Sequence, residues 1–379
     1  MIKIIITVLG IFFSLPVPAQ QEFVNIDRFV PHLSTVPANK GTKVGLYLHE
    51  KLTTATLERI DSGDRIQGVV LFVHGNSIPS VPDFDLPYRD YSWMAYLAQA
   101  GFDIFAMDHT GYGFSPRPYM DNPCNLKEED QRILIPHTLE NICSPEYPFR
   151  LNNSDSDWDE IDSVVDYIRQ LRDVDKVNLI GWSWGGIRAG GYAARHPGKV
   201  EKLVLYAPAY RRDGSSEPVE TVPGAGVPMS LQTRAALMQT RWRDLVECDG
   251  QIDAGIQPAI WQNIMGFDAL GSTWHPQGVM RVRNGDYWGW NREDAARVAA
   301  ATLILVGEQD FLLPVARELY PDLTGTENKA MAIMECATHF AVWEQTQYKF
   351  MQEASKEWLL HGTLRGQKQG IVNINANRP

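Results

Sequence analysis

The sequence is short of basic residues and of cysteine, and each shortage excludes a class of function. The chain has 35 Lys and Arg against 46 Asp and Glu, a formal net charge of −11. Nucleic acids and anionic membrane surfaces bind clusters of Lys and Arg, so neither is an expected partner. The four cysteines lack the Cys-x-x-Cys spacing of a zinc site. The composition is compatible with a small-molecule substrate. No metal or other cofactor is expected.

Long apolar runs are also missing, except at the N-terminus. Lys3 precedes an apolar run from Ile4 to Leu15, and Val17 and Ala19 follow at a small-x-small spacing. This pattern is typical of a secretory signal peptide, whereas a membrane anchor needs about 20 apolar residues. We therefore expect residues 1–19 to be a cleaved signal peptide. The mature protein should then be secreted or periplasmic, with no stable membrane span.

If the protein is exported, its cysteines are expected to form disulfides, because disulfides persist outside the cytoplasm. Four thiols allow three pairings. Cys124 and Cys143 share one Pro- and Asn-rich segment, so we expect a local disulfide between them. Cys248 and Cys336 are far apart in the sequence and either pair or stay free.

Most of the chain alternates between short apolar runs and helical patterns. Runs that are apolar on both faces indicate central strands of a parallel sheet. The expected strands are 68–73, 102–107, 177–180, 203–206, 302–306 and 330–334, and the expected helices are 93–100, 160–172, 184–195 and 342–360. Two further strands, 44–48 and 54–60, look like a hairpin. The fold class is therefore α/β, with a doubly wound, mostly parallel sheet.

Two stretches interrupt this alternation. Residues 116–157 are rich in Pro, Asn and acidic residues, and we interpret them as an insertion in the core. Residues 209–298 are too long for a structureless loop, so we expect a mostly helical cap there. The core then comprises residues 20–208 and 299–362, and residues 363–379 should form a loose tail.

The sharpest motif is Gly181-Trp182-Ser183-Trp184-Gly185-Gly186, which directly follows an apolar strand and opens a helix. This strand–turn–helix context gives the Gly-x-Ser-x-Gly pattern its meaning. Side chains at positions 181 and 185 would collide in such a turn. The turn would expose the Ser183 hydroxyl and place the Trp184 N–H at a helix start, where the backbone is electropositive.

A serine hydroxyl needs a base to become a good nucleophile. In this strand–helix architecture the order along the chain is Ser, acid, His, which leaves His339 and His361 as the histidines after residue 310. His361 follows the final helix, whereas His339 lies on a loop at the carboxyl end of the sheet, where ligands bind in open α/β folds. We therefore expect His339 to be the base.

The acid should follow the preceding strand. Asp310 lies a few residues past that strand in a turn, and a carboxylate there could accept from His339 Nδ1. Glu308 is the local competitor.

The reaction also needs two N–H donors for the oxyanion. Trp184 supplies one, and the loop His74-Gly75-Asn76-Ser77 should supply the other through Asn76. His74 itself is expected to be structural, hydrogen-bonded beneath this loop.

These motifs together resemble the α/β-hydrolase superfamily. The set is His74-Gly75, Asp108-x-x-Gly111-x-Gly113-x-Ser115, Gly181-x-Ser183-x-Gly185-Gly186, Gly307-x-x-Asp310 and His339-Phe340. The resemblance covers roughly residues 44–210 and 300–360. It implies a Ser–Asp–His triad, an acyl-enzyme, no cofactor and a lid after the sixth strand. The chain lacks the His-Gly-Gly-Pro-Gly of prolyl iminopeptidases, and Ser183 stands where epoxide hydrolases and haloalkane dehalogenases carry Asp.

The expected function is hydrolysis of a carboxylic ester or lactone through an acyl-enzyme. The alternatives are amide hydrolysis by the same triad and a non-catalytic binding protein on a hydrolase fold. Trp182, Trp288 and Trp290 are candidate substrate-binding residues. Gly285 and Gly289 suggest an irregular loop whose aromatic rings could favour a bulky apolar or aromatic substrate, although Trp242 and Trp261 are expected to be core. The sequence does not indicate an oligomeric state.

Overall fold

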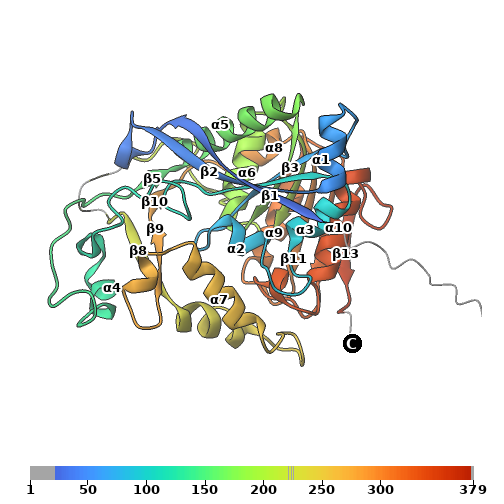
Figure 1. Ribbon diagram of the computed structural model, residues 1–379. Coiled ribbons are helices and arrows are strands. Elements are labelled where there is room, and N and C mark those ends of the chain that lie inside the picture. Colours follow the sequence, from blue (N-terminus) through green and yellow to red (C-terminus); the bar gives the residue numbers. More distant parts are fainter. Residues whose placement is uncertain (1–21, 221, 223, 225, 377–379) are drawn as a thin grey trace, which may run out of the picture.

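A computed structural model describes residues 22–220, 222, 224 and 226–376, so the expected signal peptide at 1–19 lies outside the described residues (Figure 1). The chain forms a nine-stranded sheet in the order β1-β2-β4-β3-β6-β7-β11-β12-β13. β2 is antiparallel to β1 and β4, and all the later neighbours are parallel. The strands are β1 (Phe23–Leu33), β2 (Lys43–Thr53), β3 (Val69–Val73), β4 (Asp103–Met107), β6 (Val177–Trp182), β7 (Val200–Tyr206), β11 (Ala301–Gly307), β12 (Lys329–Met334) and β13 (Gly370–Ile374). The expected doubly wound, mostly parallel sheet is confirmed.

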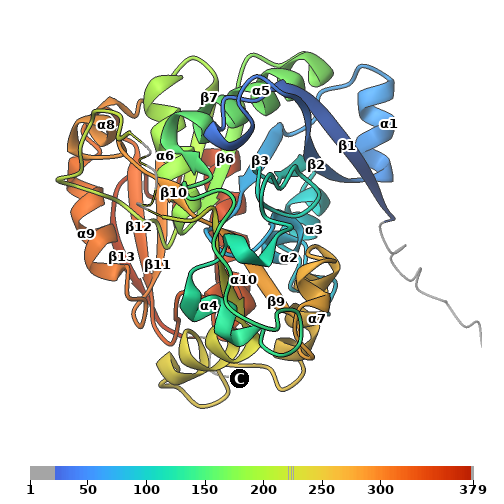
Figure 2. The ribbon, with the colours of Figure 1, turned by 90° about the vertical axis from the view of Figure 1, so that its left-hand side faces the viewer.

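Helices cover both faces of this sheet (Figures 1 and 2). Alternate residues of β3 belong to different hydrophobic clusters, Phe72 to the one containing α3 and α10, and Leu71 to the one containing α5, α6 and α9. The helices are α1 (Thr54–Asp61), α2 (Ser80–Phe84), α3 (Trp93–Gln99), α4 (Glu128–Ile133), α5 (Ser154–Arg172), α6 (Trp184–Arg195), α7 (Ile256–Gly266), α8 (Arg292–Arg297), α9 (Leu313–Asp322) and α10 (Tyr348–His361). Among the described residues, no helix combines the length and the apolarity that a bilayer span requires.

The two segments that interrupt the alternation of strands and helices, 116–157 and 209–298, pack against each other outside the nine-stranded sheet. The first carries α4 and β5 (Asn152–Asn153), and the second carries β8 (Met229–Thr233), α7, β9 (Val279–Arg283), β10 (Gly285–Asp286) and α8. β5 pairs with β10, and Leu134 and Leu151 of the first segment share a buried cluster with Met229 and Trp274 of the second. Figure 2 shows α4 beside β9, with α7 next to them. Disulfides join Cys124 to Cys143, as expected, and Cys248 to Cys336.

The segment 209–298 differs from the expected mostly helical cap. It contains an antiparallel strand pair, β8 and β9, in addition to helices. Its last part does not belong to a cap, because α8 packs against α6 and α9, and Ala295 and Val298 are buried in the core cluster of that face. Only the residues before β10 remain as a candidate cap.

Three expectations about the chain ends and the first helix were wrong. Residues 54–60 form α1 rather than a strand, because the Thr53 side chain caps the helix by accepting from the Thr56 N–H at 3.1 Å. Residues 23–33, which are not among the expected strands, form β1 along the whole of β2. The tail from residue 363 is not loose as far as it is described, because β13 pairs with β12 and buries Ile374 in the core.

Candidate active site

Ser183 occupies a strained turn between β6 and α6. Its backbone has φ 57° and ψ −116°, a left-handed φ that costs free energy for a residue with a side chain. A Cβ at Gly181 would lie 2.5 Å from the Gly185 carbonyl oxygen, and one at Gly185 would lie 2.3 Å from the Val73 carbonyl oxygen. Both glycines are therefore required for this turn, as the motif predicted.

Ser183 and His339 line the same pocket, of about 130 Å³. His339 lies on the loop between β12 and α10, and its Nδ1 is 3.1 Å from both carboxylate oxygens of Asp310, which follows β11. Asp310 also accepts from the Leu312 N–H at 2.8 Å, which fixes the carboxylate. If Nδ1 donates to Asp310, Nε2 is left free to accept a proton. The competitors Glu308 and His361 are both exposed.

The backbone of His339 is held from beneath by two aromatic side chains. The Trp182 indole N–H and the Tyr206 hydroxyl donate to the His339 carbonyl oxygen at 3.2 Å and 2.7 Å. Trp182 also lines the pocket, so it fixes the histidine loop and forms part of the pocket wall.

Two backbone N–H groups beside Ser183 have no hydrogen-bond partner among the described residues, those of Asn76 and Trp184. Both residues line the pocket. The Ser183 carbonyl oxygen accepts from the N–H groups of Gly186 and Ala209 at 2.8 Å and 2.9 Å. Because the C=O and N–H of a trans peptide point in opposite directions, these bonds turn the Trp184 N–H the other way.

Arg188 orients the second N–H group, that of Asn76, in the loop after β3. Its Nη1 donates to the carbonyl oxygens of His74 and Gly75, both at 2.9 Å, so the Asn76 N–H of the Gly75–Asn76 peptide points away from Arg188. His74 Nδ1 also donates to the Gly75 carbonyl, and His74 Nε2 accepts from the His109 N–H. His74 is thus structural, as expected.

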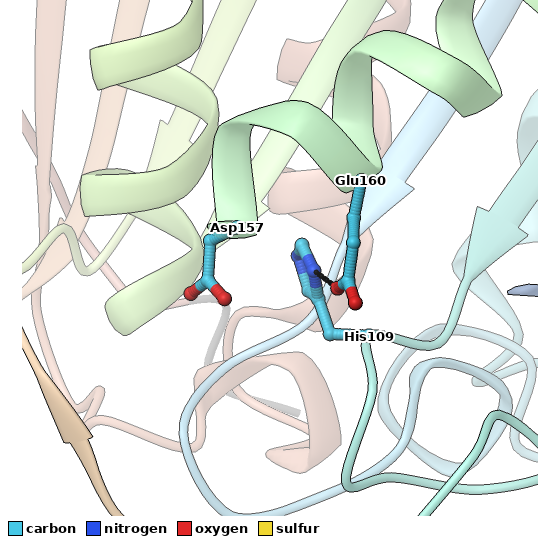
Figure 3. Close-up of side chains that lie close together, drawn as sticks. All are labelled: His109, Asp157 and Glu160. Atoms are coloured by element: carbon cyan, nitrogen blue, oxygen red, sulfur yellow. Dashed lines mark hydrogen bonds and ion pairs between the residues drawn. The ribbon is translucent and has the colours of Figure 1, made fainter. Parts of the chain in front are cut away.

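Arg188 belongs to a buried polar cluster that the sequence did not reveal. Figure 3 shows His109, from the loop after β4, beside Asp157 and Glu160 of α5. His109 Nδ1 lies 2.8 Å from Glu160, while Asp157 accepts from Arg188 at 2.9 Å and from Arg283 at 2.7 Å. Three such side chains could in principle hold a metal ion. Two guanidinium groups on the same carboxylate make the site unfavourable for a cation, so we interpret it as the support of the 74–76 loop.

Two further residues of the pocket, Asp83 and Arg241, were not predicted from the sequence. Asp83 of α2 accepts from the Gly75 N–H at 3.2 Å, and its burial raises the pKa of its carboxyl well above the usual value. Arg241, from the segment between β7 and β11, also lines the pocket. Neither position carries a motif, so only the fold brings them to Ser183.

Trp288 and Trp290 do not lie at the pocket. Their residues are 3% and 0% exposed, within the core cluster beside α6. The Trp290 ring fills the space left by Gly190, where a Cβ would lie 2.4 Å from it, and its indole N–H donates to the Ala209 carbonyl at 3.0 Å. The prediction that these two rings bind substrate is therefore wrong.

Comparisons with known proteins agree with this geometry. A family model described as alpha/beta hydrolase fold matches residues 68–258. The chain is 30% identical over 116 residues to the human serine hydrolase BPHL, and 52% identical over 44 residues to the poly(3-hydroxyalkanoate) polymerase subunit PhaC of Allochromatium vinosum. These matches span 30% and 12% of the chain, and only 29% and 12% of the two relatives.

A solved structure extends the likeness to most of the chain. A serine hydrolase involved in carbazole degradation, the CarC enzyme, superposes with a TM-score of 0.51 at 17% identity, covering 89% of this chain and 99% of that one. At this identity the match concerns the fold. Together with the family model, which matches half of the sequence, it shows that this chain belongs to the α/β hydrolase fold family.

Proposed function

We propose that the protein is a secreted serine hydrolase that cleaves a carboxylic ester or lactone through an acyl-enzyme. One observation carries the proposal: Ser183, His339 and two unpartnered N–H groups line one pocket, and His339 is hydrogen-bonded to Asp310. This is the set of groups that acyl transfer needs, namely a nucleophile, a base, its orienting acid and donors for the oxyanion.

In the proposed mechanism His339 Nε2 takes the proton of Ser183 as the hydroxyl attacks the substrate carbonyl. The negative charge that develops on the carbonyl oxygen is stabilised by the N–H groups of Asn76 and Trp184. Asp310 keeps the imidazole in the required tautomer and stabilises its protonated form. His339 then protonates the leaving alcohol, activates a water molecule and returns the proton to Ser183 when the acyl-enzyme is hydrolysed.

The segment between β7 and β10 acts in this proposal as a cap, because Leu237 and Arg241 complete the pocket wall. The expected preference for a bulky apolar or aromatic substrate loses the support of Trp288 and Trp290. Apolar contact with the substrate is available instead from the other apolar side chains of the pocket wall, namely Ile78, Trp182, Trp184, Leu237, Phe311, Leu312 and Phe340. The two disulfides are compatible with export, which the proposal includes.

A substrate panel tests the proposal. Purified wild type and Ser183→Ala are assayed on p-nitrophenyl esters, lactones and aminoacyl anilides. We expect turnover of esters or lactones by the wild type and a loss of several orders of magnitude in the variant. Selective cleavage of anilides would favour amide hydrolysis instead. The absence of turnover on every class would favour the non-catalytic binding protein.

A further inference from the structure

The pocket around Ser183 contains a cation without a counter-ion. Arg241 lines the pocket, and within the described part of the chain its side chain makes a single hydrogen bond, from Nη1 to the Ser77 hydroxyl oxygen at 3.2 Å. No carboxylate of the described part of the chain lies within ion-pair distance of it. Burial lowers the pKa of its guanidinium. A partly desolvated charge of this kind is costly unless something compensates it.

Other buried arginines of the protein are compensated. Arg188 and Arg283 share Asp157 at 2.9 Å and 2.7 Å, and Arg281 pairs with Asp268 at 2.7 Å. The fold therefore supplies a carboxylate where an arginine has a structural role. At Arg241 it supplies none, and the free face of the guanidinium lies in the wall that surrounds the nucleophile.

The one carboxyl in the pocket wall does not offset this charge. Burial raises the pKa of Asp83 well above its usual value. The negative charge of Asp108 raises this pKa further, and the hydrogen bond from the Gly75 N–H lowers it. The carboxyl is thus biased towards its neutral form. Asp83 accepts from the Gly75 N–H and makes no ion pair with Arg241, so the charge of Arg241 stays without a counter-ion in the pocket wall.

A second cavity continues this cationic character. It has a volume of about 610 Å³ and shares Asn76 and Trp184 with the pocket. Four basic residues line it, of which Arg150 is paired with Asp286 and Arg283 with Asp157, both at close range. The other two, Lys127 and Arg211, have no ion pair among the described residues. A positive cleft on an acidic protein concentrates anions at its mouth and disfavours cationic ligands.

We propose that the natural substrate is an ester that carries a carboxylate, and that Arg241 binds this carboxylate while Ser183 attacks the ester carbonyl. This inference rests on the proposed function and specifies its substrate class. Guanidinium and carboxylate match in planar geometry, and a hydrogen-bonded pair in a partly dry pocket is strong. The pocket is small, so the carboxylate lies a few bonds from the scissile carbonyl. Its source is either the acyl group, in a dicarboxylic acid monoester, or the alcohol, in a hydroxycarboxylic acid.

Two matched ester pairs test the proposal. In the acyl arm, mono-4-nitrophenyl adipate is compared with 4-nitrophenyl hexanoate, which has a methyl group in place of the carboxylate. In the alcohol arm, the butyrate ester of 3-(4-hydroxyphenyl)propanoate is compared with that of 4-propylphenol. The readout is the ratio of kcat/KM for the charged ester to kcat/KM for its neutral partner, measured for wild type, Arg241→Gln, Arg241→Lys and the control Arg234→Gln.

We expect a wild-type ratio of at least tenfold in one arm, which also identifies the source of the carboxylate. Arg241→Gln should reduce that ratio at least tenfold, and Arg241→Lys should restore part of it because the charge returns without the planar fork. Arg234 lies in the same segment and does not line the pocket, so its variant should keep the wild-type ratio. A ratio below one in both arms of the wild type, or the same ratio in folded Arg241→Gln, would overturn the assignment.

The failure of this inference is distinguishable from the failure of the proposed function. If the wild type hydrolyses neutral esters and a fluorophosphonate labels Ser183, but no preference for charge appears, only the assignment of Arg241 is contradicted. If the folded protein is neither labelled nor active, the serine-hydrolase function itself is contradicted.

Discussion

The Nη1 atom of Arg188 lies 2.9 Å from the carbonyl oxygen of Gly75, and this bond sets the direction of the Asn76 N–H. Arg188 is itself fixed by Asp157 through its Nε at 2.9 Å. The proposed oxyanion donor therefore depends on an ion pair that does not touch substrate.

Arg188→Gln should lower kcat by ~10²-fold, because a catalytic group misplaced by about 1 Å can cost this much. Since kcat reports the transition state, KM should change less. Steady-state kinetics well below the melting temperature provide the measurement.

Arg281→Gln is the matched control for this variant. Arg281 is equally buried and ion-paired, but it contacts Asp268 and the Met120 carbonyl instead of the 74–76 loop. Breaking either pair should cost about 3–5 kcal/mol of stability. If both variants lost kcat to the same extent, Arg188 would have no specific role in positioning the loop.

The acid of the proposed triad is tested by Asp310→Asn against Glu308→Gln. An amide at 310 favours the wrong histidine tautomer, and we expect kcat to fall by roughly 10³–10⁴-fold. Glu308 is exposed, so its variant should do much less. The reverse order of effects, with both proteins folded, would move the acid to Glu308.

The positions of Ser183, Asp310 and His339 were predictable because each residue follows a strongly patterned strand, and the strand order of a parallel sheet brings such turns to one edge. The supporting residues were not predictable. Arg188 lies within a regular helix and Asp157 in its neighbour, so neither carries a local signal. Only the packing of α5 on α6 brings them under the loop after β3.

The errors in the fold have a similar origin. Residues 54–60 are rich in β-branched side chains, but the Thr53 cap outweighs this weak preference. β13 lies at the edge of the sheet, and its exposed Ile371 and polar neighbours hide the strand pattern. Trp288 and Trp290 follow irregular backbone, which suggested a binding loop. The burial of Trp290 depends on Gly190, about one hundred residues earlier in the sequence.

The Cys248–Cys336 disulfide joins the proposed cap to the loop that carries His339. Glu344 reinforces this link, because it accepts from Thr338 on the loop and from Trp242 and Gln251 in the cap segment. Replacing both cysteines by Ala should cost up to about 4–5 kcal/mol in the chain-entropy model, given a sequence separation of 88. It should also lower kcat, because the histidine loop loses a covalent anchor.

The Cys124–Cys143 disulfide is the internal control for this prediction. It closes a sequence separation of 19 in a segment that does not carry the triad, and its loss should cost about 3 kcal/mol. The double Ala variant should keep the kcat of the wild type at temperatures where it is folded. Thermal melts and esterase assays on both double variants decide the matter. If the two double variants had equal kcat values, the Cys248–Cys336 disulfide would contribute to stability alone.

Because His109 is buried, we expect the free energy of unfolding to decrease in mild acid. Burial lowers the pKa of its imidazole well below the usual value, and Arg188 and Arg283 lower it further against the effect of Asp157. The unfolded chain, with a histidine pKa of about 6.5, binds a proton that the folded protein does not. This stabilisation is thus present above pH of about 6.5 and decreases as the pH falls below it.

His109→Gln should reduce the slope of unfolding free energy against pH by up to about 1.4 kcal/mol per pH unit between about pH 6.5 and 5. Urea denaturation at a series of pH values measures this slope. His361→Gln is the control, because His361 is exposed. The same slope in wild type and His109→Gln would show that His109 does not remain neutral in the folded protein.

The most direct test of the proposed chemistry is covalent labelling of the nucleophile. The folded wild-type protein is treated with a fluorophosphonate, digested and mapped by mass spectrometry, with Ser183→Ala and Ser77→Ala treated in parallel. Ser77 also lines the pocket but has no base assigned to it. We expect one adduct, on Ser183, in the wild type and in Ser77→Ala, and none in Ser183→Ala, together with loss of esterase activity in proportion to labelling. An adduct on another serine, or undiminished turnover by Ser183→Ala, would contradict the assignment of Ser183 as the nucleophile.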